Sequence, residues 1–207
     1  VKDPITGMHK WIVSFDINSL YPHLIMQYNI SPEKIIGVKS SGISVDKLLK
    51  QATPLTHLKT EGACITPNGA MFKTDSLGFL PRLLQSMYND RVKFKTLEFQ
   101  AKQEYQKTKS KELTNKIATY HNIQWAKKIA LNSAYGAIGN QYFRYYDVRQ
   151  ATAITTSGQF VIRFIESKVN EYMNSILKTH DKIDYIVASD TDSIYLCLDK
   201  LVDQVCK

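Results

Sequence analysis

The stretch that most constrains the fold runs from Ile186 to Leu196, where apolar, β-branched and aromatic residues flank a short polar centre. This pattern predicts two antiparallel strands joined by a tight turn. Asp190 and Asp192 would then stand at the tip of a hairpin. Two carboxylates so close repel each other, which raises one pKa, unless a divalent cation such as Mg²⁺ neutralises them. Because Asp is also common in ordinary turns, the hairpin alone does not separate a metal site from a polar turn.

Composition narrows the class of protein. Of the 207 residues, 43% are apolar, and the formal charge is +8. This composition predicts a globular chain with a polyanionic partner, either nucleic acid or an anionic membrane surface. No apolar run is long enough to span a membrane, and no signal peptide is visible. The three cysteines lack metal-ligand spacing and favour a reducing, intracellular compartment. Because the chain opens without Met and stops just after the hairpin, we expect a piece of something larger.

Another acidic residue, Asp16, closes a predicted strand that begins at Trp11. This strand shows little alternation, which predicts burial on both faces. A helix should follow with Pro22 in its first turn, leaving the amides just before it without partners. Free N–H groups beside a carboxylate that holds Mg²⁺ would suit a triphosphate. The alternative is that Asp16 or Ser19 simply caps this helix.

Two long helical patterns occupy the middle of the chain. Apolar residues recur at helical spacing from Leu80 to about Lys107, and a second helix should run from about residue 112 to 132. The short link between them predicts an antiparallel pair. Arg91 falls on the apolar stripe of the first helix and Lys95 lies one turn beyond. A cation on such a stripe is costly unless it meets an anion.

The end of the second helix carries three polar or aromatic residues on one face: Lys128, Asn132 and Tyr135. Gly136 is then a natural terminator. This face could hold a phosphate and a base together. An exposed helix pair with a solvated polar face, serving only as scaffold, is the competing interpretation.

The remaining segments predict structure more than chemistry. Residues 64–72, with Asn68-Gly69 between apolar flanks, indicate a small hairpin. Residues 141–149 are rich in aromatics and Arg, including Arg144, and suit either sugar–phosphate contacts or a packed loop. Residues 151–176 predict a core helix packed on the sheet that carries the acidic hairpin, and residues 199–207 predict the start of another helix.

Three separated stretches now resemble, in order, the A, B and C motifs of family B DNA polymerases. They are Asp16-x-x-Ser19-Leu20-Tyr21-Pro22, Lys128-x3-Asn132-Ser133-x-Tyr135-Gly136 and Asp190-Thr191-Asp192-Ser193. The surrounding residues 29–33 and 142–155 resemble the T-even-like bacteriophage branch. The resemblance covers nearly the whole chain.

The resemblance implies an α+β fold: a polymerase palm, which is an antiparallel sheet backed by long helices, with an inserted fingers subdomain of two antiparallel helices. The implied boundaries are residues 1–78 for the first part of the palm, 79–134 for the fingers and 135–207 for the second part of the palm. The upstream proofreading exonuclease and the downstream thumb of the family are absent from this sequence.

The resemblance also implies roles for individual residues. Asp16 and Asp192 would hold two Mg²⁺ ions, with Asp190 a weaker ligand and the Ile17 backbone a further one; these three aspartates and Lys128 would be catalytic. The triphosphate would be bound by Ser19, the Leu20 backbone, Arg91, Lys95 and Lys128. Tyr21 would stack under the deoxyribose and exclude a 2′-hydroxyl, while Asn132 and Tyr135 would line the nascent base pair. DNA would be contacted by Tyr135, Gly136 and Arg144.

The expected activity is template-directed transfer of deoxynucleotides from dNTP to a primer 3′-hydroxyl. Primer–template DNA and dNTP are the implied partners, with a sliding clamp and a chain supplying the missing regions as further ones; the implied location is the cytoplasm of an infected bacterium. A membrane partner is not expected. Without a thumb, DNA affinity should be weak and strongly salt-dependent.

The sequence departs from the family in two places and leaves other functions open. Ala188-Ser189 precedes Asp190 where the family usually has Tyr-Gly, and His23 stands where Ser is common. The first departure affects the contacts expected with the primer end. The alternatives are a non-catalytic nucleic-acid-binding remnant, one half of a split polymerase, and a two-metal nuclease. A nuclease would leave the Lys128 face unexplained.

Overall fold

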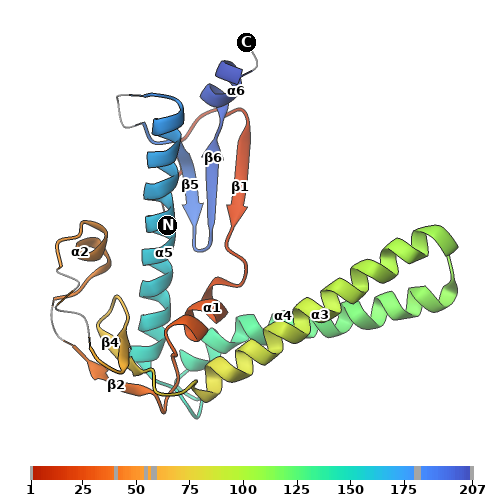
Figure 1. The fold of residues 1–207 in the computed structure, drawn as a ribbon, viewed down its shortest axis with the longest axis horizontal. Coiled ribbons are helices and arrows are strands. Elements are labelled where there is room, and N and C mark those ends of the chain that lie inside the picture. The colour runs from red at the N-terminus through yellow and green to blue at the C-terminus, as the bar shows by residue number, and fades with distance from the viewer. Residues whose placement is uncertain (1, 40–41, 54–55, 57–59, 180–182, 206–207) are drawn as a thin grey trace.

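The computed structural model describes residues 2–39, 42–53, 56, 60–179 and 183–205. It is an α+β fold with two small antiparallel sheets and several long helices (Figure 1). In chain order the elements are β1 (Ile12–Asp16), α1 (Leu20–Gln27), β2 (Ile35–Val38), α2 (Val45–Leu49), β3 (Ala63–Ile65), β4 (Ala70–Lys73), α3 (Phe79–Thr108), α4 (Lys111–Ile138), α5 (Val148–Ile176), β5 (Ile186–Asp190), β6 (Ser193–Cys197) and α6 (Asp199–Val205).

The first sheet has the strand order β1-β6-β5 and carries the acidic hairpin. The predicted hairpin is confirmed: β5 and β6 pair antiparallel, with Asp190 opposite Ser193 and only Thr191 and Asp192 between the strands. Helix α5 runs along this sheet (Figure 1). Its Ile162 and Met173 pack against buried side chains of β5 and β6, so a hydrophobic layer holds the hairpin in place.

The prediction that β1 is buried on both faces is wrong. Its Phe15 side chain is 54% exposed and Ile12 is 39% exposed. Among the described residues β1 pairs with β6 alone, so it is an edge strand. A run of apolar residues does not reveal whether a strand has neighbours on both sides, which explains the error.

The second sheet has the order β2-β4-β3 and includes the hairpin predicted over residues 64–72. Its fully buried Phe72 and Ala70 join a core with Ile25 of α1, Leu84 of α3 and Ile154 of α5. This core therefore ties α1 and the bases of the long helices to one another.

Helices α3 and α4 lie side by side and project away from both sheets (Figure 1). The antiparallel pair is confirmed, and α3 follows the predicted bounds closely. Helix α4, however, does not end at Gly136 but continues to Ile138, with Gly139 at its C-cap. The last turn is retained because Ile138 is 1% exposed and packs in the core. The expected boundary after residue 134 thus falls inside a continuous helix.

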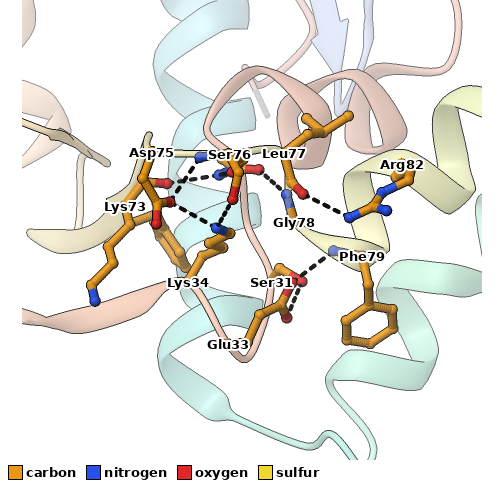
Figure 2. Close-up of polar contacts among 12 residues, drawn as sticks. Ser31, Glu33, Lys34, Lys73, Asp75, Ser76, Leu77, Gly78, Phe79 and Arg82 are labelled. Atoms are coloured by element: carbon orange, nitrogen blue, oxygen red, sulfur yellow. Dashed lines mark hydrogen bonds and ion pairs between the residues drawn. The ribbon is translucent and has the colours of Figure 1, made fainter.

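The start of α3 is capped by side chains from the segment that follows α1. Gly78, at the N-cap, has no side chain to offer. The Gly78 amide donates to Asn29 Oδ1 at 2.8 Å, and the Phe79 amide donates to Glu33 Oε1 at 2.7 Å. Figure 2 shows Glu33 at the Phe79 amide, with Lys34 bound to Asp75 and Ser76 beside it. This cluster holds the first residues of α3 in place.

The helix predicted after residue 198 is confirmed as α6, although Cys206 and Lys207 lie outside the described residues. Within the part of the chain that the structure describes, no helix has the length and hydrophobicity that a membrane crossing requires.

Candidate active site

A cavity of about 440 Å³ opens where the end of β1, the start of α1, the helix pair and the β5–β6 turn converge. Segments far apart in the sequence contribute to it. Its lining residues are Asp16, Asn18, Ser19, Leu20, Tyr21, Pro22, Arg91, Lys128, Asn132, Thr191 and Asp192.

Two carboxylates line this cavity. Asp16 ends β1 and Asp192 lies in the β5–β6 turn, and the Ile17 amide donates to the Asp192 carbonyl at 2.7 Å, joining the two segments. Burial raises the pKa of Asp192, and the negative charges of Asp16 and Asp190 raise it further. This concentration of negative charge would be relieved by a bound cation.

The donor set fits a divalent ion that takes part of its coordination from substrate and water. Among the described residues no group of three or more His, Cys, Asp or Glu side chains could hold a metal. Mg²⁺ commonly binds through one or two carboxylates plus substrate phosphates, and Asp16 and Asp192 are two carboxylates that line the same cavity. Asp190 is exposed at the end of β5 and does not line the cavity. Ile17 does not line it either, so both remain predictions as ligands.

The start of α1 leaves backbone donors free at the cavity. Ser19 is in the left-handed conformation, with φ 54° and ψ 47°, and its side chain does not cap the helix. Its hydroxyl donates to Asn18 Oδ1 instead, and no side chain of the described residues accepts from the amides of Leu20 or Tyr21. The capping alternative is therefore wrong. Free amides at a helix N-terminus attract anions.

His23 supports this unusual backbone. Its Nδ1 lies 2.9 Å from the Ser19 carbonyl oxygen, and its ring packs edge-on against Tyr88 of α3. The carbonyl can only accept, so Nδ1 carries the hydrogen. His23 thus stabilises the turn that presents the free amides.

Two cations face the cavity from the helix pair. Arg91 of α3 donates from Nη1 to Ser19 Oγ at 3.1 Å, while its buried Nε has no hydrogen-bond partner. Lys128 of α4 lines the cavity, and its Nζ lies 4.7 Å from the centre of the Trp125 ring. The hydrogen-bonding capacity of the Arg91 guanidinium is therefore not filled by the described residues. Lys95 is exposed and does not line the cavity, so its binding role stays a prediction.

One aromatic side chain, Tyr21, lines the cavity, and Tyr135, which is not part of the lining, packs against its ring. The Tyr21 and Tyr135 ring centres are 4.8 Å apart, with the ring planes at 54°. Burial raises the pKa of the Tyr21 phenol, as do Tyr135 and the nearby aspartates. Asn132 lines the cavity one helical turn from Lys128.

The other predicted DNA contacts lie away from the cavity. Gly136 is exposed on α4, and Arg144 is exposed in the loop before α5, with its guanidinium 5.7 Å from the Tyr145 ring. Sequence reasoning missed Asn18, Thr191 and Trp125. Trp125 had a usable signal, because residues three apart on a helix are neighbours and it stands three before Lys128.

Comparison with known proteins identifies the class. The model of DNA polymerase family B matches residues 1–205, and the chain therefore belongs to this family. Among its relatives are the DNA-directed DNA polymerases of Escherichia phage RB69, 32% identical, and of Enterobacteria phage T4, 33% identical. Each alignment covers 99% of this chain and 27% of the phage protein. A protein of African swine fever virus named DNA polymerase beta is 29% identical, over 99% of this chain and 17% of that protein. The chain thus spans about a quarter of the length of its phage relatives.

Proposed function

We propose that this chain carries the catalytic centre of a virus-encoded DNA-directed DNA polymerase that acts in an infected bacterial cell. The reaction is transfer of a deoxynucleotide from dNTP to the 3′-hydroxyl of a primer paired to a template. One observation carries the proposal: a single cavity is lined by two carboxylates, a free helix N-terminus and two cations. Membership of DNA polymerase family B supports the same reaction.

In this proposal the β1-β6-β5 sheet with α5 is the palm, and the α3–α4 pair is the fingers. Asp16 and Asp192 would hold Mg²⁺, with Asp190 a weaker ligand. When bound, two such ions would activate the 3′-hydroxyl and stabilise the leaving pyrophosphate in an in-line displacement.

The chain's own residues bind and orient the nucleotide. The amides of Leu20 and Tyr21, the Arg91 guanidinium and the Lys128 ammonium converge on the space for the triphosphate. Their positive charge opposes the negative charge that develops on the leaving group. Tyr21 lies under the sugar, and Asn132 and Tyr135 border the base pair. The two-metal nuclease alternative does not account for this convergence of cations and free amides.

The test compares two lysines that are adjacent in sequence. Lys128→Ala should weaken the apparent dNTP affinity and slow incorporation by at least about tenfold, because each lost phosphate contact costs on the order of 1.5–3 kcal/mol. Lys127→Ala removes the same charge outside the cavity, where Lys127 pairs with Asp90 at 2.8 Å, and should leave nucleotide affinity near that of the wild type. Single-turnover kinetics in the natural full-length gene product provide the measurement. Weakened duplex binding in both variants, with unchanged dNTP affinity, would place Lys128 on a DNA track instead.

A further inference from the structure

A glycine occupies the middle of α5 at the point where this helix passes α1. Gly158 is buried within a helix of 29 residues. Glycine in a helix interior costs about 1 kcal/mol relative to alanine, so the helix itself gives no reason for it. An isolated glycine inside a helix can serve close packing.

The neighbour that requires the glycine is Tyr21. A Cβ at position 158 would lie 3.1 Å from Tyr21 Cε1, closer than carbon atoms normally approach. The same Cβ would lie 3.7 Å from Leu20 Cδ2 and 3.8 Å from Leu24 Cδ1, which are ordinary van der Waals contacts. The Tyr21 ring is therefore what leaves too little room for a side chain.

Tyr21 is also a residue of the candidate site. It lines the cavity, whereas Gly158 does not. The backbone that carries the ring has little freedom, because Pro22 and Leu20 are both buried beside it. A methyl group at position 158 would therefore be accommodated mainly by displacement of the ring away from α5, and the displaced ring belongs to a residue that lines the cavity.

We propose that Gly158 sets the depth of the Tyr21 ring and thereby acts as a positioning residue for sugar selection. This inference rests on the proposed function, in which Tyr21 lies under the deoxyribose. A Tyr21 ring packed closely against α5 leaves room for the sugar. A ring displaced a few tenths of an ångström away from α5 would press on any nucleotide. A ribonucleotide, with an additional oxygen at C2′, would be affected more than a deoxynucleotide.

The experiment is a double-mutant cycle in the natural full-length gene product. Gly158→Ala is made with Tyr21 intact, in a Tyr21→Phe background and in a Tyr21→Val background. Binding of dATP and of ATP is measured opposite template dT, on a primer ending in a dideoxynucleotide. With Tyr21 or Tyr21→Phe, Gly158→Ala should weaken dATP binding about threefold to tenfold and ATP binding more strongly. In the Tyr21→Val background, where Cε1 is gone, both effects should disappear, because coupling is expected between contacting residues.

Two outcomes of the binding measurement would overturn the inference. One is that Gly158→Ala weakens nucleotide binding equally in the Tyr21→Val background, and the other is that it leaves binding unchanged beside intact Tyr21. If the wild type itself binds no dATP, the proposed function fails, and thermal unfolding then tests the ring contact alone.

If the Gly158→Ala variant folds poorly, its melting temperature still tests the contact between position 158 and the Tyr21 ring. In the Tyr21→Val background Gly158→Ala should raise the melting temperature, because alanine favours the helix; beside intact Tyr21 this gain should be lost or reversed. Ser175→Ala, an exposed site on the same helix, should have the same effect in both backgrounds. Equal effects of Gly158→Ala in both backgrounds would overturn the inference.

Discussion

At the scale of single residues, the ionisation of Asp192 makes the stability of the folded protein depend on pH. Its raised pKa means that the folded protein disfavours the ionised carboxylate, primarily through burial and then through the charge of Asp16. The contribution of this group to stability is therefore fully present below its unfolded pKa, about 3.9, and is lost as pH rises through the folded pKa.

Asp192→Asn should consequently raise the melting temperature of the metal-free protein at about pH 7, and this advantage should vanish at about pH 3. Added Mg²⁺ should raise the melting temperature of the wild type and have little effect on the variant, because a ligand that binds only the folded state stabilises it. Calorimetry with and without Mg²⁺ gives the measurement. If Asp192→Asn lowered the melting temperature equally at both pH values, Asp192 would have only a structural role.

Discrimination between deoxyribose and ribose also depends on a single residue, Tyr21. Tyr21→Val should increase the relative use of ribonucleotides by at least about tenfold, because removing the ring opens space at C2′, and a steric block of this kind acts against one ligand more than another. The ratio of deoxynucleotide to ribonucleotide incorporation efficiency is the readout, with the melting temperature beside it. If Tyr21 is only a core aromatic, the variant should lose on the order of 3 kcal/mol of stability while the ratio stays unchanged.

At the scale of elements, the base of α3 depends on Asn29. Its side-chain amide donates to the carbonyls of Lys73 and Ser76, and its oxygen accepts from the Gly78 amide. Asn29 itself has φ 54°, a conformation that Asn and Gly tolerate better than other residues. Burial alone would raise the pKa of neighbouring Glu33, but hydrogen bonds from Ser31 and the Phe79 amide outweigh it and hold that pKa below its usual value. The cap of α3 is thus a set of interlocking bonds.

Asn29→Gly retains the backbone conformation and removes these bonds, and should cost about 2–4 kcal/mol of unfolding free energy. Asn29→Ala adds the strain of a left-handed residue and should cost about 1 kcal/mol more. Chemical denaturation of both variants measures the difference. Equal costs would contradict the backbone argument, and negligible costs would contradict the role of Asn29 as the cap.

The elements also show what sequence patterns can and cannot predict. The acidic hairpin, the antiparallel helix pair and the core helix α5 follow from hydrophobic periodicity, because each pattern extends over many residues. The exposure of β1 and the continuation of α4 past Gly136 do not follow, because both depend on tertiary neighbours. Lys95 stands one turn from Arg91 along α3 but remains outside the cavity, since helical spacing fixes a face and not the position where that face meets another element.

At the scale of the whole molecule, the site exists only because distant segments converge. Asp16 and Ser19 come from the start of the chain, Arg91 and Lys128 from the two projecting helices, and Asp192 from its end. The three motifs indicated Asp16, Ser19, Lys128 and Asp192, and the apolar stripe of the first long helix indicated Arg91. Only the fold shows that Arg91 reaches Ser19 and that Asp190 is not part of the cavity lining. The central claim is that this convergence is a polymerase active centre organised by Asp16 and Asp192.

The most direct test is single-turnover incorporation of one dNTP by the natural full-length gene product, comparing Asp192→Asn and Asp16→Asn with the wild type. Asp203→Asn, on exposed α6 outside the cavity, is the matched control for loss of one carboxylate. We predict that either cavity variant lowers the rate by at least about three orders of magnitude, on the order of 4 kcal/mol in activation free energy. Primer–template affinity should stay near the wild-type value, and the control should be as fast as the wild type. Incorporation by Asp192→Asn at the wild-type rate would contradict the assignment of the active centre.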